Sequence, residues 1–228
     1  RLGHLEDEPQ QLARGGRVWP YLPLGEVRVF FGGNAWSAPA RYVRELDLDE
    51  AVARVRFEAG GTEHRREGFV SAPDQVAAFR FRVEPTQKVD AVIHLARKYD
   101  AHTRQPACED ETDTLIFTGT AGTLGPHFVA ALRVVCQDGH VNRAGDRLMV
   151  RGADELVLLV AVASDFASPR SETELVREAL ATVGAAAAHG WDGLRARHVA
   201  DYQRLYGRAS LVIEGHNATE NRPVDERI

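Results

Sequence analysis

The segment AVARVRFE at residues 51–58 alternates apolar and charged side chains, and this alternation decides the class of fold. Its apolar residues would face one side of an extended strand, and its two arginines and its glutamate would face the other. The same period of two recurs at residues 26–31 and 77–83. Strands with one apolar and one polar face are typical of antiparallel sheets. We therefore expect the apolar side of each strand to lie in a core.

Further strand candidates follow along the chain, separated by short turn sequences. They lie at residues 115–119, 126–136, 147–151 and 155–163. Asp138-Gly139, between Gln137 and His140, predicts a tight hairpin, because this dipeptide tolerates positive φ angles. Many strands without interleaved helices indicate a mainly β protein, folded as a large antiparallel β-sandwich or supersandwich of two packed layers.

The pattern changes to a helical one after residue 166. Ser171 and Glu174 have the spacing of a capping box, and Gly190 is expected to end the helix that follows. The apolar side chains of this first helix are Val176, Leu180, Val183 and Ala187. A second helix, which Gly207 would end, carries Trp191, Leu194, His198, Tyr202 and Leu205 on one face. Such faces need a partner: the sandwich, each other or another domain.

These patterns divide the chain into three parts. Residues 1–166 form the β-sandwich domain, and residues 167–208 form a two-helix linker. Residues 209–228 contain a short strand at 211–213 and a polar, extended tail.

Composition excludes several classes of partner. The chain has 228 residues and a formal net charge of −5, which gives no basic face for nucleic acid. Its longest apolar run, residues 156–163, is far shorter than the ~20 residues that cross a bilayer. Cys108 and Cys136 are too few for a disulfide framework or a four-ligand zinc site. Cys136 falls in phase with apolar neighbours, which predicts a buried thiol. The two cysteines do not indicate whether the protein works in an oxidising or a reducing compartment.

No complete catalytic motif is found, so no catalytic, cofactor-binding or metal-binding residue is predicted. His64, His94 and His127 would form a metal site only if the fold gathered them, and ordinary hydrogen-bonded histidines are favoured. The acidic cluster Glu109-Asp110-Glu111-Asp113 is a calcium candidate, with a solvated loop as the favoured alternative. A second cluster, Asp47, Asp49 and Glu50, lacks the glycine and distant glutamate of a calcium loop and suits a strand end or turn.

Two further features bear on carbohydrates. Trp19, Tyr21 and Trp36 lie near turns and would stack sugar rings if they were exposed, with core anchors as the alternative. Asn217-Ala218-Thr219 matches a glycosylation acceptor, a pattern that often arises by chance.

Six short segments, in a fixed order, carry a resemblance to a known family. They are YLPLGEV at 21–27, YVRELDL at 42–48, REGFVSAPDQ at 66–75, RGAD at 151–154, HVADY at 198–202 and DERI at 225–228. This series resembles the N-terminal region of glycoside hydrolase family 95, the α-L-fucosidase family, from about residue 18 to residue 228.

The resemblance implies a large β-sandwich and helical linker that precede an (α/α)6 barrel. In that family the acid and base carboxylates come from the barrel, and the reaction is inverting hydrolysis of α-L-fucosides or α-L-galactosides. The family's opening segment would lie before Arg1 and the barrel after Ile228, so no catalytic residue is carried over. The expected partners are the barrel of the same parent chain and a carbohydrate, with no nucleic acid, no membrane and no cofactor.

The function expected is therefore that of a non-catalytic N-terminal domain of an inverting glycoside hydrolase, inactive as a fragment. The linker stripe of Trp191, Leu194, Tyr202 and Leu205 is expected to contact the barrel. The alternative is a glycan-binding sandwich without hydrolase activity. The compartment stays open, although the resemblance favours a secreted or periplasmic protein.

Overall fold

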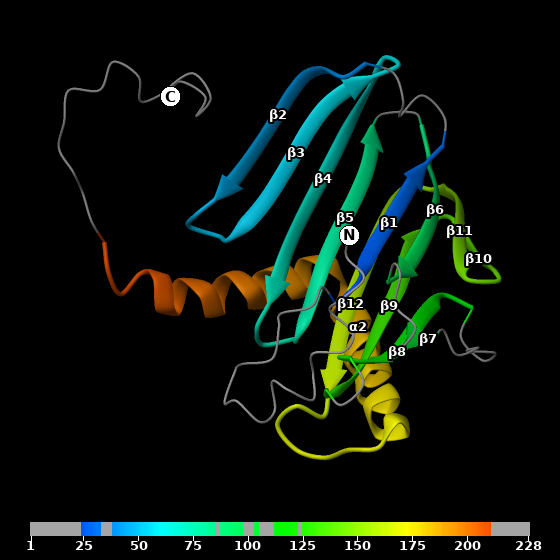
Figure 1. Cartoon of the computed structure of the whole chain (residues 1–228). Coiled ribbons are helices and arrows are strands. Elements are labelled where there is room, and N and C mark those ends of the chain that lie inside the picture. Colours follow the sequence, from blue (N-terminus) through cyan, green and yellow to red (C-terminus); the bar gives the residue numbers. More distant parts are fainter. Residues whose placement is uncertain are drawn as a thin grey trace, which may run out of the picture.

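A computed structural model describes residues 24–32, 38–84, 87–97, 103–104, 112–122 and 125–210. It contains two antiparallel sheets and one long helix, in three layers (Figure 1). The mainly β sandwich expected from the sequence is confirmed. No helix in these ranges is long and apolar enough to span a membrane.

The smaller sheet has four strands in the order β1-β6-β11-β10. Their bounds are Glu26–Phe31 for β1, Val89–Ala96 for β6, Arg147–Ala153 for β11 and His140–Ala144 for β10. The larger sheet has eight strands in the order β2-β3-β4-β5-β12-β9-β8-β7. Their bounds are Ala40–Asp47 (β2), Val52–Ala59 (β3), Thr62–Ser71 (β4), Val76–Glu84 (β5), Glu155–Ser164 (β12), His127–Gln137 (β9), Thr114–Thr120 (β8) and Thr103–Arg104 (β7).

One hydrophobic core lies between the two sheets, and β6 shows why it forms. The segment VDAVIHLA buries every second side chain, including Val89, Ile93 and Leu95, against the larger sheet. The smaller sheet covers the β5, β12, β9 and β8 part of the larger one, whose inner residues complete this core. Cys136 packs at its margin and is partly buried, so the predicted buried thiol is only half-buried. Burial raises the pKa of this thiol.

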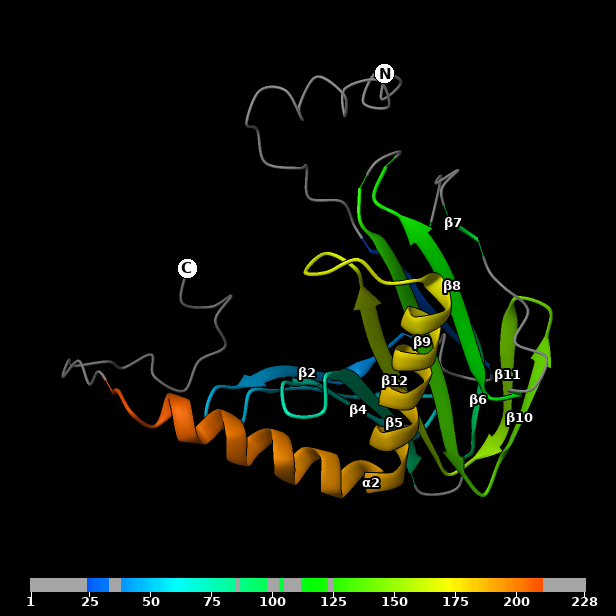
Figure 2. The same ribbon diagram turned by 90° about the horizontal axis from the view of Figure 1, so that it is seen from below.

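The helix α2, Glu172–Tyr206, replaces the two helices expected from the sequence. Ser171 and Glu174 form the predicted capping box, with the Glu174 N–H 3.3 Å from Ser171 Oγ and the Ser171 N–H 2.8 Å from Glu174 Oε2. Gly190 does not end the helix but kinks it, with φ 65° and ψ 170°, and Gly207 caps its end. The first arm, residues 172–189, runs beside β9 and β12, and the second arm, residues 191–206, runs beneath β2 and β4 (Figure 2).

A second hydrophobic core lies between α2 and the outer face of the larger sheet. The buried helix residues are Leu175, Ala179, Val183, Ala186, Trp191, Leu194 and His198. Val183 belongs to the stripe expected from the sequence, whereas Val176, Leu180 and Ala187 are only partly buried beside it. The buried stripe is therefore rotated by about one residue from the one expected.

Two expectations about the strands are wrong. Asp138-Gly139 does not close a hairpin: β9 pairs with β12 and β8, and β10 pairs with β11 in the other sheet. The turn carries the chain from one layer to the other, and a Cβ at Gly139 would lie 2.7 Å from the backbone of Ala153. The apolar sides of residues 51–58 and 77–83 are also not fully buried, because the smaller sheet is four strands narrower than the larger one.

Candidate functional site

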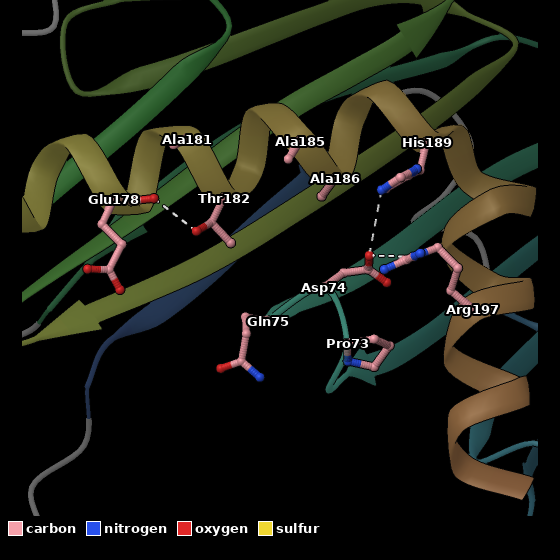
Figure 3. Close-up of a pocket in the computed structure, with 10 residues that line it drawn as sticks. All are labelled: Pro73, Asp74, Gln75, Glu178, Ala181, Thr182, Ala185, Ala186, His189 and Arg197. Carbon is pink, nitrogen blue, oxygen red and sulfur yellow. Dashed lines mark hydrogen bonds and ion pairs between the residues drawn. The ribbon is translucent and has the colours of Figure 1, made fainter. Parts of the chain in front are cut away.

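Asp74, in the turn between β4 and β5, joins three elements at the bend of α2 (Figure 3). Its buried carboxylate accepts hydrogen bonds from Ser71 Oγ at 2.7 Å and from Arg197 Nε at 2.7 Å, while His189 Nε2 lies 3.8 Å away. His189 ends the first arm of α2 and Arg197 belongs to the second. The carboxylate therefore holds the two arms at a fixed angle to the hairpin.

A groove with a volume of about 440 Å³ opens beside this joint. Two carboxylates line it, Asp74 and Glu178, which is the minimum set for acid–base hydrolysis of a glycoside. Both are already engaged, because Arg197 pairs with Asp74 and Arg170 pairs with Glu178. The arginine side chains occupy oxygens that a substrate or a catalytic water would otherwise contact. The groove therefore has the chemistry of a structural joint.

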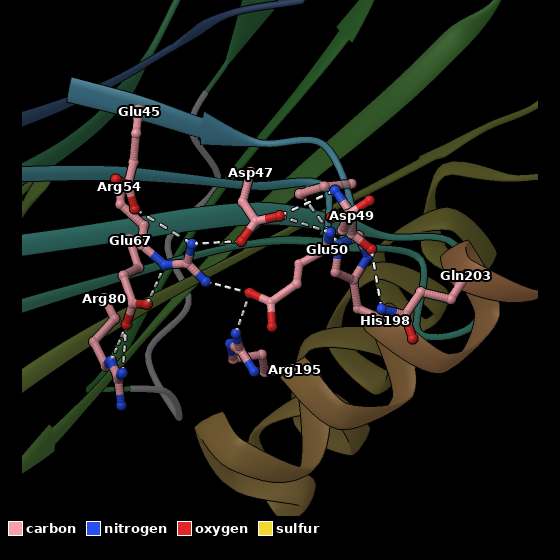
Figure 4. A network of polar contacts seen from close by, with 11 residues as sticks. Glu45, Asp47, Asp49, Glu50, Arg54, Glu67, Arg80, Arg195, His198 and Gln203 are labelled. Carbon is pink, nitrogen blue, oxygen red and sulfur yellow. Dashed lines mark hydrogen bonds and ion pairs between the residues drawn. The ribbon is translucent and has the colours of Figure 1, made fainter. Parts of the chain in front are cut away.

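A larger polar network follows the outer face of the sheet from β2 to α2 (Figure 4). At its centre Arg54 of β3 contacts Asp47 at 2.9 Å, Glu67 at 3.3 Å and Glu45 at 3.4 Å. Arg54 also pairs with Glu50, which in turn pairs with Arg195 of the helix. Burial alone would lower the pKa of Arg54, but its hydrogen bonds to carboxylates outweigh burial and raise that pKa.

Glu67 of β4 connects this network to β5. Its carboxylate accepts from Arg54 Nε and from Arg80 Nε, the latter at 3.1 Å. Burial raises the pKa of Glu67, and the two arginines more than compensate, so that the net pKa is lowered. The pKa values of Asp47 and Glu67 are lowered and that of Arg54 is raised, so these three groups are held in their charged forms, which suits a fixed scaffold.

The second arm of α2 is seated by aromatic contacts beside the network. Phe69 packs against Trp191, with ring centroids 5.0 Å apart, and stacks on His198 at 4.7 Å. Arg80 lies over the Trp191 ring at 4.7 Å. His198 Nε2 is 3.2 Å from the carbonyl oxygen of Ala51, in the turn that follows β2. Trp191 and Leu194 are thus buried within this chain, so the expectation that they contact another domain is wrong; Leu205 is exposed.

The candidate metal residues are placed on separate elements. His64 of β4 stacks on Phe57, His94 of β6 meets Phe30 edge-on, and His127 Nδ1 lies 2.9 Å from Asp165 Oδ2. In the parts of the chain that the structure describes, no group of three or more His, Cys, Asp or Glu side chains is arranged to hold a metal ion.

The acidic clusters have different outcomes. Asp47 ends β2 and accepts hydrogen bonds from the backbone N–H groups of Asp49 and Glu50, so the predicted strand end and turn are confirmed. Of the cluster at 109–113, Asp113 pairs with Arg133 at 3.0 Å, and residues 109–111 lie outside the described residues. Several other candidates also lie outside the described residues: Trp19, Tyr21, Trp36, Cys108, residues 211–213 and Asn217-Ala218-Thr219.

Neither the Asp74 joint nor the Arg54 network was identified from the sequence, although a signal was present. Arg54, Glu67 and Arg80 stand at the same phase of three strands, and antiparallel pairing places them directly opposite one another. Alternating charges on consecutive strands are therefore the signal for such a ladder. Asp74 and Ser71 lie in the segment 66–75 that carries the family resemblance, which indicates that this segment builds the joint.

Comparison with known proteins gives consistent matches. The family model described as "Glycosyl hydrolase family 65, N-terminal domain" matches residues 4–169. Alpha-L-fucosidase 2 of Arabidopsis thaliana is 27% identical over 229 residues, and the match covers 88% of this chain and 27% of the relative. Probable alpha-fucosidase A of Aspergillus niger is 24% identical, with 81% of this chain and 25% of the relative covered.

Among solved structures, a putative kojibiose phosphorylase from the human microbiome has a TM-score of 0.59 and 12% sequence identity. The match covers 79% of this chain and 27% of that one, and at this identity it shows the fold alone. The chain spans about a quarter of the length of the curated relatives it matches.

Proposed function

Because the chain belongs to the family of glycosyl hydrolase family 65 N-terminal domains, we propose that it is the non-catalytic N-terminal domain of an α-L-fucosidase-like glycoside hydrolase. The recognition of a glycoside hydrolase N-terminal β-sandwich from sequence is confirmed by the family match. Membership of family 95, the inverting mechanism and the fucoside substrate are the finer parts of the proposal. Two relatives with α-fucosidase names support the fucoside substrate, and the order of the six sequence segments supports family 95 and, with it, the inverting mechanism.

The family match over residues 4–169 is the observation that carries the proposal. The described carboxylates support the non-catalytic part. Those that line the groove at the joint are paired with arginines, and the half-buried ones of the outer face belong to the Arg54 network. Inverting hydrolysis needs one carboxylic acid and one carboxylate placed on opposite sides of the sugar, with room for a water molecule. We place that pair in a catalytic domain joined to this one.

The proposal assigns a role to each part of the chain. Residues 1–166 are the sandwich that supports the catalytic domain, residues 167–208 are the helical linker, and residues 209–228 lead to the barrel. The kinked helix suits a linker, because Arg195 and Arg197 tie its second arm to the sheet and the second hydrophobic core holds its first arm. A linker fixed in this way holds the following domain in one orientation.

Hydrolysis of a synthetic α-L-fucoside tests the proposal. We expect the longer protein to release L-fucose and the isolated chain to release none above the uncatalysed rate. The anomer first released, followed by NMR, is expected to be inverted relative to the substrate. Measurable turnover by the isolated chain would contradict its non-catalytic role. If the longer protein cleaves the α-L-galactoside but not the fucoside, the substrate of the proposal changes and glycoside hydrolysis remains its reaction.

A further inference from the structure

The inner face of the larger sheet is apolar beyond the reach of the smaller sheet. Strands β2, β3 and β4 project past the four-stranded sheet, and only β5 borders it (Figures 1 and 2). Four large apolar side chains point from this region with substantial exposure. They are Tyr42 (54% exposed), Leu46 (62%), Val70 (71%) and Phe79 (36%). We call these four residues the open face.

Strand pairing makes the open face continuous. Leu46 pairs with Ala53, Ala53 with Gly68, and Gly68 with Phe79, so one apolar row crosses four strands. The Phe79 ring lies over Gly68, where an added Cβ would stand 2.9 Å from the ring. Sequence periodicity predicted that this side of β3 and β5 would be buried. Contiguous exposed apolar surface of this kind marks an interaction site in soluble proteins.

A polar anchor lies at one end of the face. The rings of Phe57 and His64 stack with centroids 4.7 Å apart, and Arg66 lies over Phe57 and Phe31 at 4.9 and 4.8 Å. His64 Nε2 is buried without a hydrogen-bond partner, and no carboxylate in the described ranges acts on the Arg66 guanidinium. The buried ring nitrogen and the half-buried guanidinium therefore have unused hydrogen-bonding capacity, which polar partners supplied from outside would satisfy.

The position of the helix indicates what supplies them. The second arm of α2 covers the outer face of the same strands and reaches the turn after β2, where Gln203 Nε2 donates to the carbonyl oxygen of Asp49 at 3.1 Å. Leu205 and Tyr206, at its end, are exposed, as is Leu48 in that turn. The relatives are about four times as long as this chain. The chain therefore leaves α2 beside the β2 edge of the open face, on its way to the following domain.

We propose that the open face binds the following domain of the longer protein, through apolar contacts and through polar groups that reach His64 and Arg66. This inference rests on the proposed function for the existence of that domain. It adds the surface: the domain wraps the β2 edge and packs on the inner side, opposite the helix. An exposed edge strand with apolar side chains invites aggregation, and such a domain would cover it.

Hydroxyl-radical labelling of side chains, read by mass spectrometry, tests the inference. The longer protein and the isolated chain are labelled under identical conditions. Tyr42, Leu46 and Phe79 are expected to react more slowly in the longer protein, on the order of threefold or more, because interface cores exclude water. Phe166, exposed on the loop after β12, is the control and should react equally in both. Equal labelling of the open face in the two proteins would overturn the inference.

A substitution gives an independent measurement. Leu46→Asp is expected to shift the melting temperature of the isolated chain by less than about 2 °C, and that of the longer protein by roughly 4 °C or more. Phe166→Asp should leave both unchanged. Loss of a dimer in the isolated chain on Leu46→Asp would show that the face binds a second copy, and protection by added oligosaccharide would show a glycan site. Either result would overturn the inference.

The two hypotheses fail in different ways. A longer protein that hydrolyses the fucoside while its open face labels freely refutes the docking surface and keeps the function. Protection of the open face in a longer protein without hydrolase activity refutes the function and keeps the surface.

Discussion

The two faces of strands β2–β5 carry opposite chemistry although they share one backbone. The outer face presents charged residues in pairs and is covered by the second arm of α2. The inner face presents mainly apolar residues, and its part beyond the smaller sheet, the open face, has no cover in the part of the chain that the structure describes. Charges that pair with one another make a face self-sufficient, whereas apolar surface is stabilised only when another element buries it. The comparison shows that this chain alone covers the outer face of these strands, whereas the open face needs another element to bury it.

Two phenylalanines on neighbouring strands give the largest difference between the faces. Phe69 points outwards and is 4% exposed against Trp191, and Phe79 points inwards and is 36% exposed. Phe69→Ala should destabilise the isolated chain by about 3–5 kcal/mol, and Phe79→Ala by about 1 kcal/mol, because only the first leaves a cavity. Chemical denaturation measures both. If Phe69→Ala does not fold, Phe69→Leu should still cost more than Phe79→Leu. Equal losses would remove the contrast.

The charged network is expected to give the next largest effect, through Glu67. Its pKa is lowered in the folded chain, so the interaction stabilises fully above the unfolded pKa of about 4.3 and is lost as the pH falls through the folded value. Glu67→Gln should cost about 1–3 kcal/mol at pH 7, because it leaves Arg54 and Arg80 short of a partner. The free energies of unfolding of the two proteins, measured from pH 7 to pH 3, should begin to converge as the pH falls below the unfolded pKa of about 4.3.

A variant that stays less stable by the same amount at pH 3 would contradict this account of Glu67. The loss would then come from packing, which does not depend on protonation.

The kink at Gly190 lets one helix cover both halves of the outer face. With φ 65° this position is left-handed, and an added Cβ would meet nothing within 4 Å. Gly190→Ala should therefore cost about 1–2 kcal/mol from backbone strain alone. Gly184→Ala is the matched control: it lies inside the first arm, its Cβ would lie 3.7 Å from Arg133, and it should stabilise by up to about 1 kcal/mol. Thermal denaturation distinguishes the two, and an equal effect would exclude strain at the kink.

Local signals in the sequence predicted most of the strands and the start of the helix. Alternation located β1, β3 and β5, further apolar segments located β8, β9, β11 and β12, and the capping box located the first turn of α2. Strands β2, β4, β6, β7 and β10 were not assigned: charged residues occupy both faces of β4, whereas β6 alternates and was missed. Which strands share a sheet is a non-local property, so Asp138-Gly139 was predicted as a hairpin when it connects two layers.

The candidate site was less predictable than the fold. The Asp74 joint brings together residues more than a hundred positions apart, Asp74 and Arg197, and no spacing rule links them. The apolar side of residues 77–83 was predicted to lie in a core and is only partly buried, because periodicity marks an apolar face but does not say which element covers it. The open face was identified because the sequence pattern is that of a buried face and the side chains are exposed in the structure.

The smallest effect is expected at the far rim of the outer face, where the ladder leaves the helix. Arg65 pairs with Glu63 at 3.1 Å and with Glu84 at 3.8 Å, but its side chain is 45% exposed, so water screens both pairs. Arg65→Ala should change the free energy of unfolding by less than about 0.5 kcal/mol, and 0.5 M NaCl should abolish the change. Glu67→Gln, one step nearer the helix, should keep most of its effect in salt. If Arg65→Ala lowers the free energy of unfolding as much as Glu67→Gln does, the helix does not strengthen the ion pairs of the outer face. The stability of that face would then depend on the number of ion pairs alone.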